Sequence, residues 1–358
     1  GADQYIKPTG QWENLFEDPY SEIVERDPIA RDVDVVVVGA GFSGLIVGAK
    51  LVQANIDDFV IRDKAGDVGG VWYWNRYPGA MCDTAAMIYL PLAEEVGTVP
   101  SAKYVAAPEI HAHAKRIATT FDLYDKALLS TGIESVVWDD AASHWVVRTD
   151  RGDTLRAKYV CMGTGPLHRP KLPGIPGLQS FKGHAFHTSR WDYAYTGGDP
   201  SGAIMSNLAD KRVGIIGTGA TAVQCIPHLG EWAEHLFVFQ RTPSSIDIRN
   251  NHDIDPEWYA TLEPGWQQRW QENFVTLQTG GFADVDLVKD GWTDISQRIR
   301  DRMMDMFSKG LPDGMTPQQA WLRAYEDGDD EKMNEIRARV DEIVNDPETA
   351  DHLKPWYR

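Results

Sequence analysis

The sequence is poor in cysteine, and this scarcity excludes small proteins held together by disulfides or by metal. Its three cysteines, Cys82, Cys161 and Cys225, are odd in number and lie far apart. Disulfide frameworks need paired cysteines, and structural zinc sites need them at short spacings. We therefore expect no disulfide framework, no metal site, and a reducing, cytoplasmic compartment.

Basic residues and long apolar runs are also scarce. The 35 lysines and arginines are outnumbered by 53 acidic residues, which gives a formal net charge of −18. Because a polyanion would be repelled, we expect no nucleic-acid partner. The one apolar stretch that resembles a membrane span, residues 33–52, contains Asp34, Lys50 and four glycines, so we expect no membrane insertion. No secretory signal is recognisable at the start of the chain.

The apolar stretch is better explained as part of a parallel sheet. An apolar run ends at the turn Gly39-Ala40-Gly41-Phe42-Ser43-Gly44, and a helical pattern and a second short strand ending at Asp63 follow. In such a turn the first glycine permits the bend, the second lets backbone N–H groups approach a pyrophosphate, and the third lets helix and strand pack closely. Asp63 is placed to accept hydrogen bonds from ribose hydroxyls. The pattern predicts a dinucleotide site.

A second unit of the same kind begins at Lys211. Its turn is Gly217-Thr218-Gly219-Ala220-Thr221-Ala222, in which alanine replaces the third glycine, a position that has only to be small. The strand that follows ends at Gln240, Arg241 and Thr242 rather than at an acid. A cation there favours pairing with a 2′-phosphate, and so NADP(H) over NAD(H). The alternative is an exposed arginine at a strand end with no ligand.

The rest of the chain completes an α/β organisation with two dinucleotide-binding, Rossmann-like domains. Residues 132–163 alternate as three strands, the last two joined by a turn at 150–152, and a proline-rich linker follows. From Asp255 the pattern is helical, and 358 residues with 42% hydrophobic content suffice for two cores. In this helical insertion the spacing predicts four core positions, Met333, Ile336, Val340 and Ile343.

Two longer motifs resemble the fingerprints of Baeyer–Villiger monooxygenases, which are class B flavoprotein monooxygenases. The first lies within residues 69–83 and the second within residues 181–192. The matching positions are Gly69, Gly70, Trp72, Tyr77, Pro78, Gly79 and Asp83 in the first, and Phe181, Gly183, His187, Trp191 and Asp192 in the second. With both glycine turns, the resemblance extends from about Asp34 to Thr242, and it is to the N-terminal part of such an enzyme.

The resemblance implies an activity and its cofactors. An enzyme of this family uses FAD, NADPH and O2 to insert oxygen beside a ketone carbonyl through a flavin peroxide, giving an ester or a lactone. The Trp191-Asp192 ending favours ketones over heteroatoms. Two alternatives stay open, an N- or S-oxygenating flavin monooxygenase and a catalytically incomplete nucleotide-binding fragment. The sequence does not indicate an oligomeric state.

The resemblance also implies a domain plan and a set of site residues. We expect an arm (1–31), a first FAD-binding segment (32–165), and an NADPH-binding domain (166–358) with a helical insertion at about 255–345; a further FAD segment is expected beyond residue 358. The expected FAD contacts are Gly39, Gly41, Phe42, Ser43, Gly44, Asp63, Gly70, Val71, Trp72, Tyr77 and Asp83. The expected NADPH contacts are Gly217, Thr218, Gly219, Ala220, Thr221, Arg241 and Thr242. Phe181, Gly183, His187, Trp191 and Asp192 are assigned to a hinge that couples domain motion to cofactor binding, in preference to an acid–base histidine.

Asp83 is the one catalytic residue that the resemblance assigns to this chain. It is expected to orient a catalytic arginine that lies beyond residue 358, and Arg358 is not nominated for that role. Without the fingerprint, Asp83 before Thr84 would be interpreted as a helix N-cap. Cys82 has no second cysteine about five residues away, which argues against a flavin disulfide reductase.

The shape of the substrate is only weakly indicated. Met81 departs from the arginine that is frequent at this position of the family. The insertion is rich in tryptophan, with Trp258, Trp266 and Trp270. Together with the long arm, these residues favour a roomy apolar site and bulky ketones.

Overall fold

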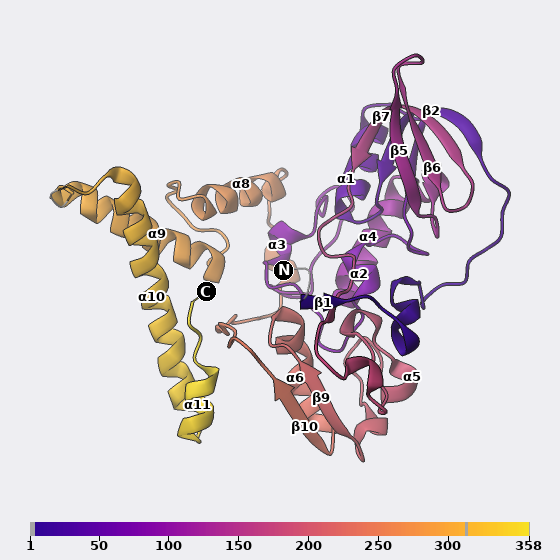
Figure 1. Ribbon diagram of the computed structural model, residues 1–358. Helices are drawn as coiled ribbons and strands as arrows, with labels where there is room; N and C mark the ends of the chain where they lie inside the picture. The colour runs from indigo at the N-terminus through magenta and orange to yellow at the C-terminus, as the bar shows by residue number, and fades with distance from the viewer. Residues whose placement is uncertain (1–3, 312–313, 358) are drawn as a thin grey trace. The chain divides into compact units, whose positions relative to one another are not determined.

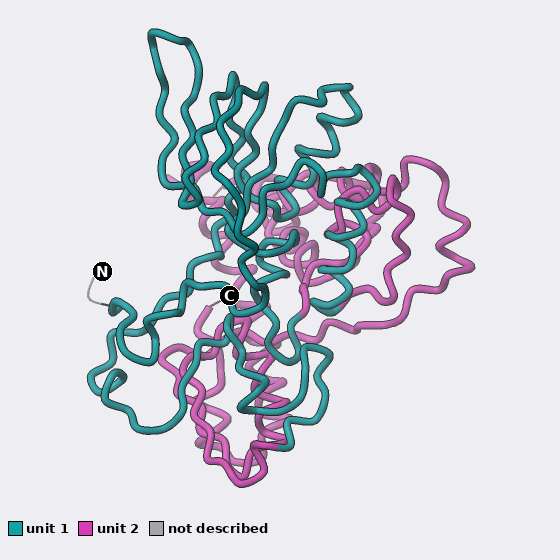
Figure 2. The backbone as a smooth tube through the Cα atoms, turned by 90° about the vertical axis from the view of Figure 1, so that its right-hand side faces the viewer, with its two compact units in different colours: residues 1–80, 106–206 teal, residues 81–105, 207–358 magenta. Residues whose placement is uncertain are grey.

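The computed structural model describes residues 4–311 and 314–357, and the chain divides into two compact units. Unit 1 comprises the residues up to 80 together with 106–206, and unit 2 comprises 81–105 and 207–358 (Figure 2). The predicted domain boundary near residue 165 therefore falls inside unit 1. Since a ligand-binding domain need not coincide with a compact unit, the predicted domains stay a prediction.

Unit 1 is built on a six-stranded mixed sheet, of which Figure 1 labels β2, β5, β6 and β7. The strand order is β4-β3-β2-β7-β6-β5. Its strands are β2 (Ala30–Val38), β3 (Phe59–Arg62), β4 (Ala127–Leu128), β5 (Ile133–Asp139), β6 (His144–Thr149) and β7 (Thr154–Met162). β2 runs parallel to β3 and β7, while β6 is antiparallel to both of its neighbours. The predicted strand–turn–helix–strand unit and the three alternating strands are confirmed.

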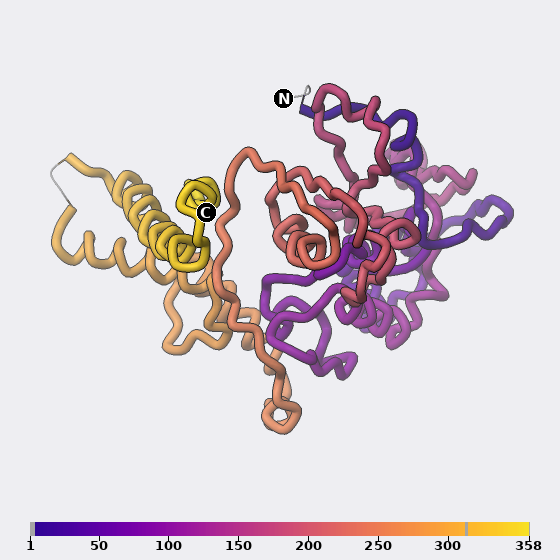
Figure 3. Tube along the Cα trace, turned by 90° about the horizontal axis from the view of Figure 1, so that it is seen from below, coloured from indigo at the N-terminus to yellow at the C-terminus, as the bar shows by residue number. Residues whose placement is uncertain are grey.

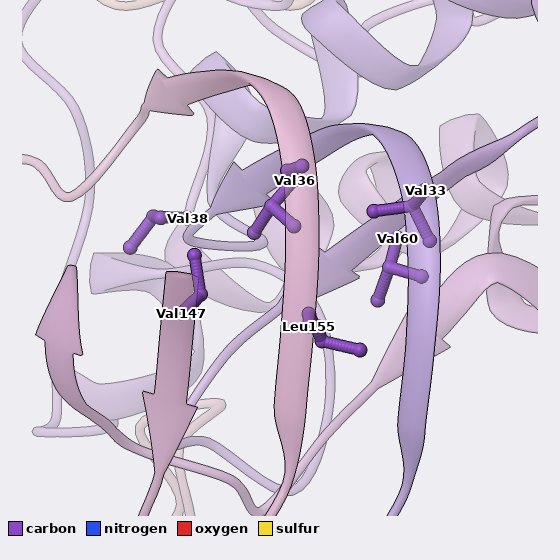
Figure 4. Close-up of a cluster of buried hydrophobic side chains, with 7 residues drawn as sticks. Val33, Val36, Val38, Val60, Val147 and Leu155 are labelled. Atoms are coloured by element: carbon purple, nitrogen blue, oxygen red, sulfur yellow. The ribbon is translucent and has the colours of Figure 1, made fainter. Parts of the chain in front are cut away.

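The core of this sheet explains the valine run of β2. Parallel strands covered on both faces are apolar at consecutive positions, and β2 is buried from Val35 to Val38 apart from small residual exposure. On one face, side chains from β2, β3, β6 and β7 form a shared cluster (Figure 4). The members of that cluster are Val33, Val36, Val38, Val60, Val147, Leu155 and Ala157.

Helices and short turns complete unit 1. The helices are α1 (Phe42–Gln53), α2 (Val71–Trp74), α4 (Ala107–Thr120) and α5 (Tyr193–Thr196), with 3₁₀ turns η2 (Gly10–Phe16), η3 (Leu123–Lys126), η4 (Leu178–Ser180) and η5 (Thr188–Arg190). α1 packs on β2, β3 and β7 and against α4. The arm pairs antiparallel with the linker through β1 (Tyr5–Ile6) and β8 (Leu172–Pro173), and the described part of the arm is thus folded onto unit 1.

A buried acid fastens the arm to the sheet. Asp153 is 1% exposed and accepts hydrogen bonds from both terminal nitrogens of Arg26, at 2.6 and 2.7 Å, and from the backbone N–H of Ile29 at 2.9 Å. Thr149 donates to it at 2.8 Å, and the buried Arg62 lies at 3.3 Å. Burial alone would raise the pKa of Asp153, but these donors hold it well below its usual range.

Unit 2 holds the second glycine turn and the helical region. Its strands β9 (Arg212–Ile216) and β10 (His235–Phe239) are parallel and are joined by α6 (Ala220–Trp232), so the second predicted unit is confirmed as a strand–helix–strand element. The other helices are α3 (Ala86–Tyr89), α7 (Pro256–Tyr259), α8 (Trp266–Gln278), α9 (Gly291–Lys309), α10 (Pro317–Ile343) and α11 (Pro347–Leu353), and η6 (Ser206–Leu208) begins at the boundary between the units.

The predicted helical region is confirmed, with one error in its core. α9 and α10 lie side by side (Figures 1 and 3), and each begins with a capping box, at Asp290 and Thr316 respectively. Met333 and Ile336 are buried as expected and Val340 is half-buried. Ile343, however, is 59% exposed, so its assignment to the core was wrong. It is the last residue of α10, where the packed stripe has already ended. In the described part of the chain, no helix is both long and apolar enough to cross a bilayer.

The Asp153 cluster predicts an acid-sensitive fold. Replacing Asp153 with alanine leaves Arg62 buried without its counter-charge, and we expect the free energy of unfolding to fall by about 3–5 kcal/mol. Because the pKa of Asp153 is lower in the folded state, its stabilisation is complete above the unfolded value near 4 and is lost as the pH falls below it. Urea titrations of the wild-type protein and the D153A variant between pH 3 and 7 measure both effects.

The matched control is Asp32→Ala, which removes an exposed ion pair with Arg156 from the same sheet. Such a pair contributes about 0–1 kcal/mol. Equal destabilisation by the two variants would contradict the special role of Asp153.

Candidate functional site

The first glycine turn is shaped by steric limits that only glycine meets. Gly39 has a φ of +104°, and a Cβ there would lie 2.4 Å from the carbonyl oxygen of Gly163. A Cβ at Gly44 would lie 1.8 Å from the carbonyl oxygen of Gly39. The turn therefore holds the end of β2 against the start of α1, where Phe42, Ser43 and Gly44 are the first helical residues. The N–H groups at a helix start attract an anion.

The fingerprint loop meets this turn backbone to backbone. The N–H of Gly69 donates to the carbonyl oxygen of Ala40 at 2.9 Å, and a Cβ on Gly70 would lie 2.8 Å from the Cα of Gly41. α2 follows at once and carries Val71 and Trp72, and Tyr77 beyond it is buried. The first turn and the start of the first fingerprint are therefore in direct backbone contact in unit 1.

Asp63 supports the turn directly. Its Oδ2 accepts the backbone N–H of Ala40 at 2.6 Å and its Oδ1 accepts that of Ala65 at 2.9 Å. Burial raises the pKa of this carboxyl, and the two backbone donors oppose the rise. Since a carboxylate oxygen has two lone pairs, each oxygen retains capacity to accept from a ribose hydroxyl. Asp63 thus holds the backbone of the turn in place, a structural role that the sequence did not indicate. Its predicted role toward the ribose is separate.

The second glycine turn is more open. Gly217 has a φ of +101° and its N–H donates to the carbonyl oxygen of Phe239 at 2.8 Å. Among the described residues, no other part of the chain lies within 4 Å of where a Cβ on Gly217 or Gly219 would be. The hydroxyl of Thr218 donates to the carbonyl oxygen of Thr242 at 3.0 Å, which ties the turn to the end of β10. Ala220 and Thr221 begin α6.

Arg241 lies beside this second turn. Its side chain is exposed, and within residues 4–311 and 314–357 it has no hydrogen-bond or ion-pair partner. An unpaired guanidinium next to a glycine turn is available for bidentate binding of a phosphate. The assignment of Arg241 to a 2′-phosphate stays a prediction.

The second fingerprint is held together in unit 1 by short-range hydrogen bonds. The indole N–H of the buried Trp191 donates to Thr196 at 3.1 Å, and Asp192 caps α5 by accepting the N–H of Tyr195. The ring of His187 accepts the N–H of Ser189 at 3.1 Å, and burial lowers the pKa of His187 to about 4. Phe181 is 57% exposed, and its ring lies 2.5 Å from where a Cβ on Gly183 would be.

Asp83 lies in unit 2 and forms an ion pair there. Its Oδ2 lies 2.8 Å from Nη2 of Arg249. The alternative of a helix N-cap is wrong, because α3 begins at Ala86 with Ala85 as its N-cap. Since most of the predicted FAD contacts belong to unit 1, the inclusion of Asp83 among them stays a prediction. Arg358 lies outside the described residues.

The arm contributes a clamp on the fingerprint loop that sequence reasoning missed. Asp18 accepts hydrogen bonds from the hydroxyl of Tyr73 at 2.6 Å and from the N–H of Gly66 at 2.8 Å. The guanidinium of Arg76 lies 3.9 Å from the ring centre of Tyr20 and 4.7 Å from that of Tyr73. The aromatic residues of the arm gave only a general signal of packing, and nothing in the spacing identified Asp18.

Two further expectations depended on cysteine and tryptophan. Cys82 is a free thiol whose pKa is raised by burial, the opposite of a reactive thiolate. Trp266 is buried, and Trp270 packs on the core cluster of Ala85, Ile88, Tyr104 and Val288. These two tryptophans fill the core of unit 2, so they do not support the expectation of a roomy site.

The fold and the glycine turn define an α/β flavoprotein of the FAD/NAD(P)-binding class. The family model described as pyridine nucleotide-disulphide oxidoreductase matches residues 36–279. Neopentalenolactone D synthase of Streptomyces avermitilis is 53% identical over 359 residues, and a Baeyer-Villiger monooxygenase of Streptomyces coelicolor is 48% identical over 359 residues; each alignment covers 100% of this chain. The polycyclic ketone monooxygenase of the thermophilic fungus Thermothelomyces thermophila matches 99% of the chain with a TM-score of 0.87 and 37% identity.

The chain belongs to the Baeyer–Villiger monooxygenase family. It spans 59% and 58% of the lengths of the two Streptomyces relatives and 60% of the fungal chain.

The arm clamp predicts a local effect of Asp18. Replacing Asp18 with alanine removes the acceptor of the Tyr73 hydroxyl and of two backbone amides, those of Tyr20 and Gly66. We expect a loss of about 1–3 kcal/mol in the free energy of unfolding, because these donors lose their partner. Hydrogen exchange followed by mass spectrometry should show faster exchange in residues 18–21 and 66–73. Glu13→Ala, at an exposed position of the same arm, is the control, and unchanged exchange in D18A would refute the clamp.

Proposed function

We propose that the natural protein containing this chain is an FAD-dependent, NADPH-consuming monooxygenase that converts a ketone and O2 into an ester or lactone. The observation that carries the proposal is the backbone contact between the fingerprint at Gly69-Gly70 and the first glycine turn. That contact places a sequence motif of the family beside a glycine turn of the kind that binds dinucleotides.

The residues of unit 1 fit FAD. Gly41 and Gly70 lie so close together that a Cβ on Gly70 would clash with the Cα of Gly41. Glycine at the second position of such a turn also lets the backbone approach a pyrophosphate. The start of α1 supplies N–H groups and positive potential. Asp63 would accept the ribose hydroxyls of the adenosine half, while Val71, Trp72 and Tyr77 would contact the cofactor from the fingerprint loop. The expected second FAD segment remains part of this proposal.

The residues around the second turn fit NADPH. The pyrophosphate would lie on the N-terminus of α6 at Gly217–Thr221, and Arg241 with Thr242 would bind the 2′-phosphate. Because a guanidinium does not accept hydrogen bonds from a ribose 2′-hydroxyl, this arrangement favours NADPH over NADH. The same arrangement makes unit 2 the core of the proposed NADPH domain, with its helical insertion from about residue 255.

The reaction consumes ketone, O2, NADPH and a proton, and yields ester or lactone, NADP⁺ and water. FAD, when bound and reduced by NADPH, supplies the activation of O2. The contribution proposed for Asp83 is to orient a catalytic arginine, so that a positive charge faces the oxygen atoms on which negative charge develops.

The second fingerprint is proposed to act as a hinge. His187 is uncharged near neutral pH because its pKa is about 4, and its ring serves as an acceptor for a backbone N–H. Those features oppose a role as a general acid or base near pH 7. Phe181, Gly183, Trp191 and Asp192 would transmit cofactor binding to motion of the linker between the nucleotide sites.

The substrate is proposed to be a bulky or polycyclic ketone. The similar fungal enzyme is named for polycyclic ketones, and the synthase from Streptomyces avermitilis is named for a lactone. Met81 supports the same preference, since it places an uncharged side chain before Asp83.

The first test is made on the full-length protein. We expect flavin absorption bands, NADPH oxidation accelerated by a polycyclic ketone, and a product heavier than the ketone by one oxygen atom with the properties of an ester. Oxygenation of an amine or sulfide with no ester would favour the heteroatom alternative. A protein that purifies without flavin and binds none on reconstitution would overturn the proposal and leave a nucleotide-binding role.

Arg241 predicts the choice of nicotinamide cofactor. In the Arg241→Ala variant we expect KM for NADPH to rise roughly 10- to 100-fold, in line with the loss of one charge-assisted contact worth about 1.5–3 kcal/mol. KM for NADH should change less than about twofold, because NADH has no 2′-phosphate. Arg323→Ala, which removes an exposed arginine of α10, is the control. An equal rise for both cofactors would contradict the phosphate assignment.

A further inference from the structure

Arg249 approaches Asp83 from a segment that no motif covers. Asp83 and Arg249 are far apart in sequence and form a charge-assisted hydrogen bond of 2.8 Å inside unit 2. The arginine side chain is 32% exposed and that of Asp83 is 49% exposed. A pair this exposed contributes little to stability. Its main effect is to orient the carboxylate of Asp83.

The backbone around Arg249 is fixed by pairing with the segment that follows Asp83. Ala102 and Asp253 form an antiparallel bridge, and the N–H of Lys103 donates to the carbonyl oxygen of His252 at 2.8 Å. Asn251 exchanges two hydrogen bonds of 2.9 Å with the backbone of Tyr104. These bonds join the segment that follows Arg249 to residues 102–104, and the N–H of Ala86 donates to the carbonyl oxygen of Lys103 at 2.7 Å, which ties the same segment to the residues just after Asp83.

A second anchor lies at the start of α9. Nη1 of Arg249 lies 3.0 Å from where a Cβ on Gly291 would be, so glycine at this position leaves room for the guanidinium. The neighbouring Asp290 is buried, and its Oδ1 caps α9 by accepting the N–H groups of Trp292 and Thr293. Its Oδ2 is buried and has no hydrogen-bond partner in the described part of the chain. Arg249 thus forms an ion pair with the exposed carboxylate of Asp83 and is attracted electrostatically by the buried Asp290.

We propose that Arg249 is a positioning residue for Asp83, held in place by the Gly291 gap and the charge of Asp290. The inference rests on the proposed function, in which Asp83 orients the catalytic arginine. A guanidinium that binds one oxygen of Asp83 leaves the other oxygen free for a second partner and limits rotation of the carboxylate. Arg249 acts only through Asp83 and touches neither substrate nor cofactor in this assignment.

The test is a double-mutant cycle in the full-length holoenzyme. Arg249→Met is made alone and together with Asp83→Asn, and ester formed and hydrogen peroxide released are measured for each NADPH consumed. We expect R249M alone to lower the ester yield per NADPH roughly tenfold or more, since small displacements of catalytic groups are costly. In the D83N background the same replacement should change the yield by less than about twofold, because its target is already lost. Arg249→Lys should restore part of the yield.

Hydrogen exchange supplies a readout that does not depend on turnover. Amides of residues 82–85 should exchange faster in R249M than in the wild-type protein, while FAD content stays unchanged. Arg298→Met removes another ion-paired arginine of unit 2, with a similar 26% exposure, and should alter neither exchange at 82–85 nor ester yield.

Two outcomes would overturn the positioning role. One is an unchanged ester yield in R249M. The other is an equal loss in the wild-type and D83N backgrounds, which would mean that Arg249 acts independently of the Asp83 carboxylate. If the wild-type enzyme forms no ester while exchange at 82–85 still responds to R249M, the proposed function fails and the control of Asp83 by Arg249 survives as a conformational finding.

Discussion

The close approach of two backbone segments, at Gly41 and Gly70, is the constraint on which the proposed FAD site depends. A Cβ on Gly70 would lie 2.8 Å from the Cα of Gly41, a distance that real Cβ atoms do not tolerate. The hydrogen bond from Gly69 to Ala40 fixes the register of that approach, and Asp63 fixes the turn from its other side. The glycine turn therefore positions the fingerprint loop. The loop in turn positions the part of the arm that contacts it through Asp18.

Charges in unit 1 are arranged to keep the arm in contact with this centre. Asp153 binds the arm at Arg26 and Ile29, and Asp18 in the arm binds the fingerprint loop at Gly66 and Tyr73. Each acid is ionised by its donors against the cost of burial, so each link is specific as well as stabilising. The arm is accordingly a structural part of unit 1, which the scatter of its aromatic residues only partly indicated.

The two glycine turns differ in how much of their form is imposed by neighbours. In the first, the glycines contact backbone at Gly163, Gly70 and Gly39, so that the turn is rigidly built. In the second, the space around Gly217 and Gly219 is open and Arg241 has no partner within the described residues.

The local elements could be predicted from the residues alone, because glycine sterics and residue periodicity act over a few positions. Both strand–turn–helix–strand units, the alternating strands of 133–162 and the helical region after Asp255 could be predicted in this way, and the fingerprints indicated the family. The contacts between distant residues became visible only in the folded chain: Asp153 with Arg26, Asp18 with Tyr73, and Asp83 with Arg249. The folded chain also shows that Ile343 is exposed and that Trp266 and Trp270 are core residues. Such contacts join positions far apart in the chain, and the periodicity of one element carries no record of which other element will lie against it.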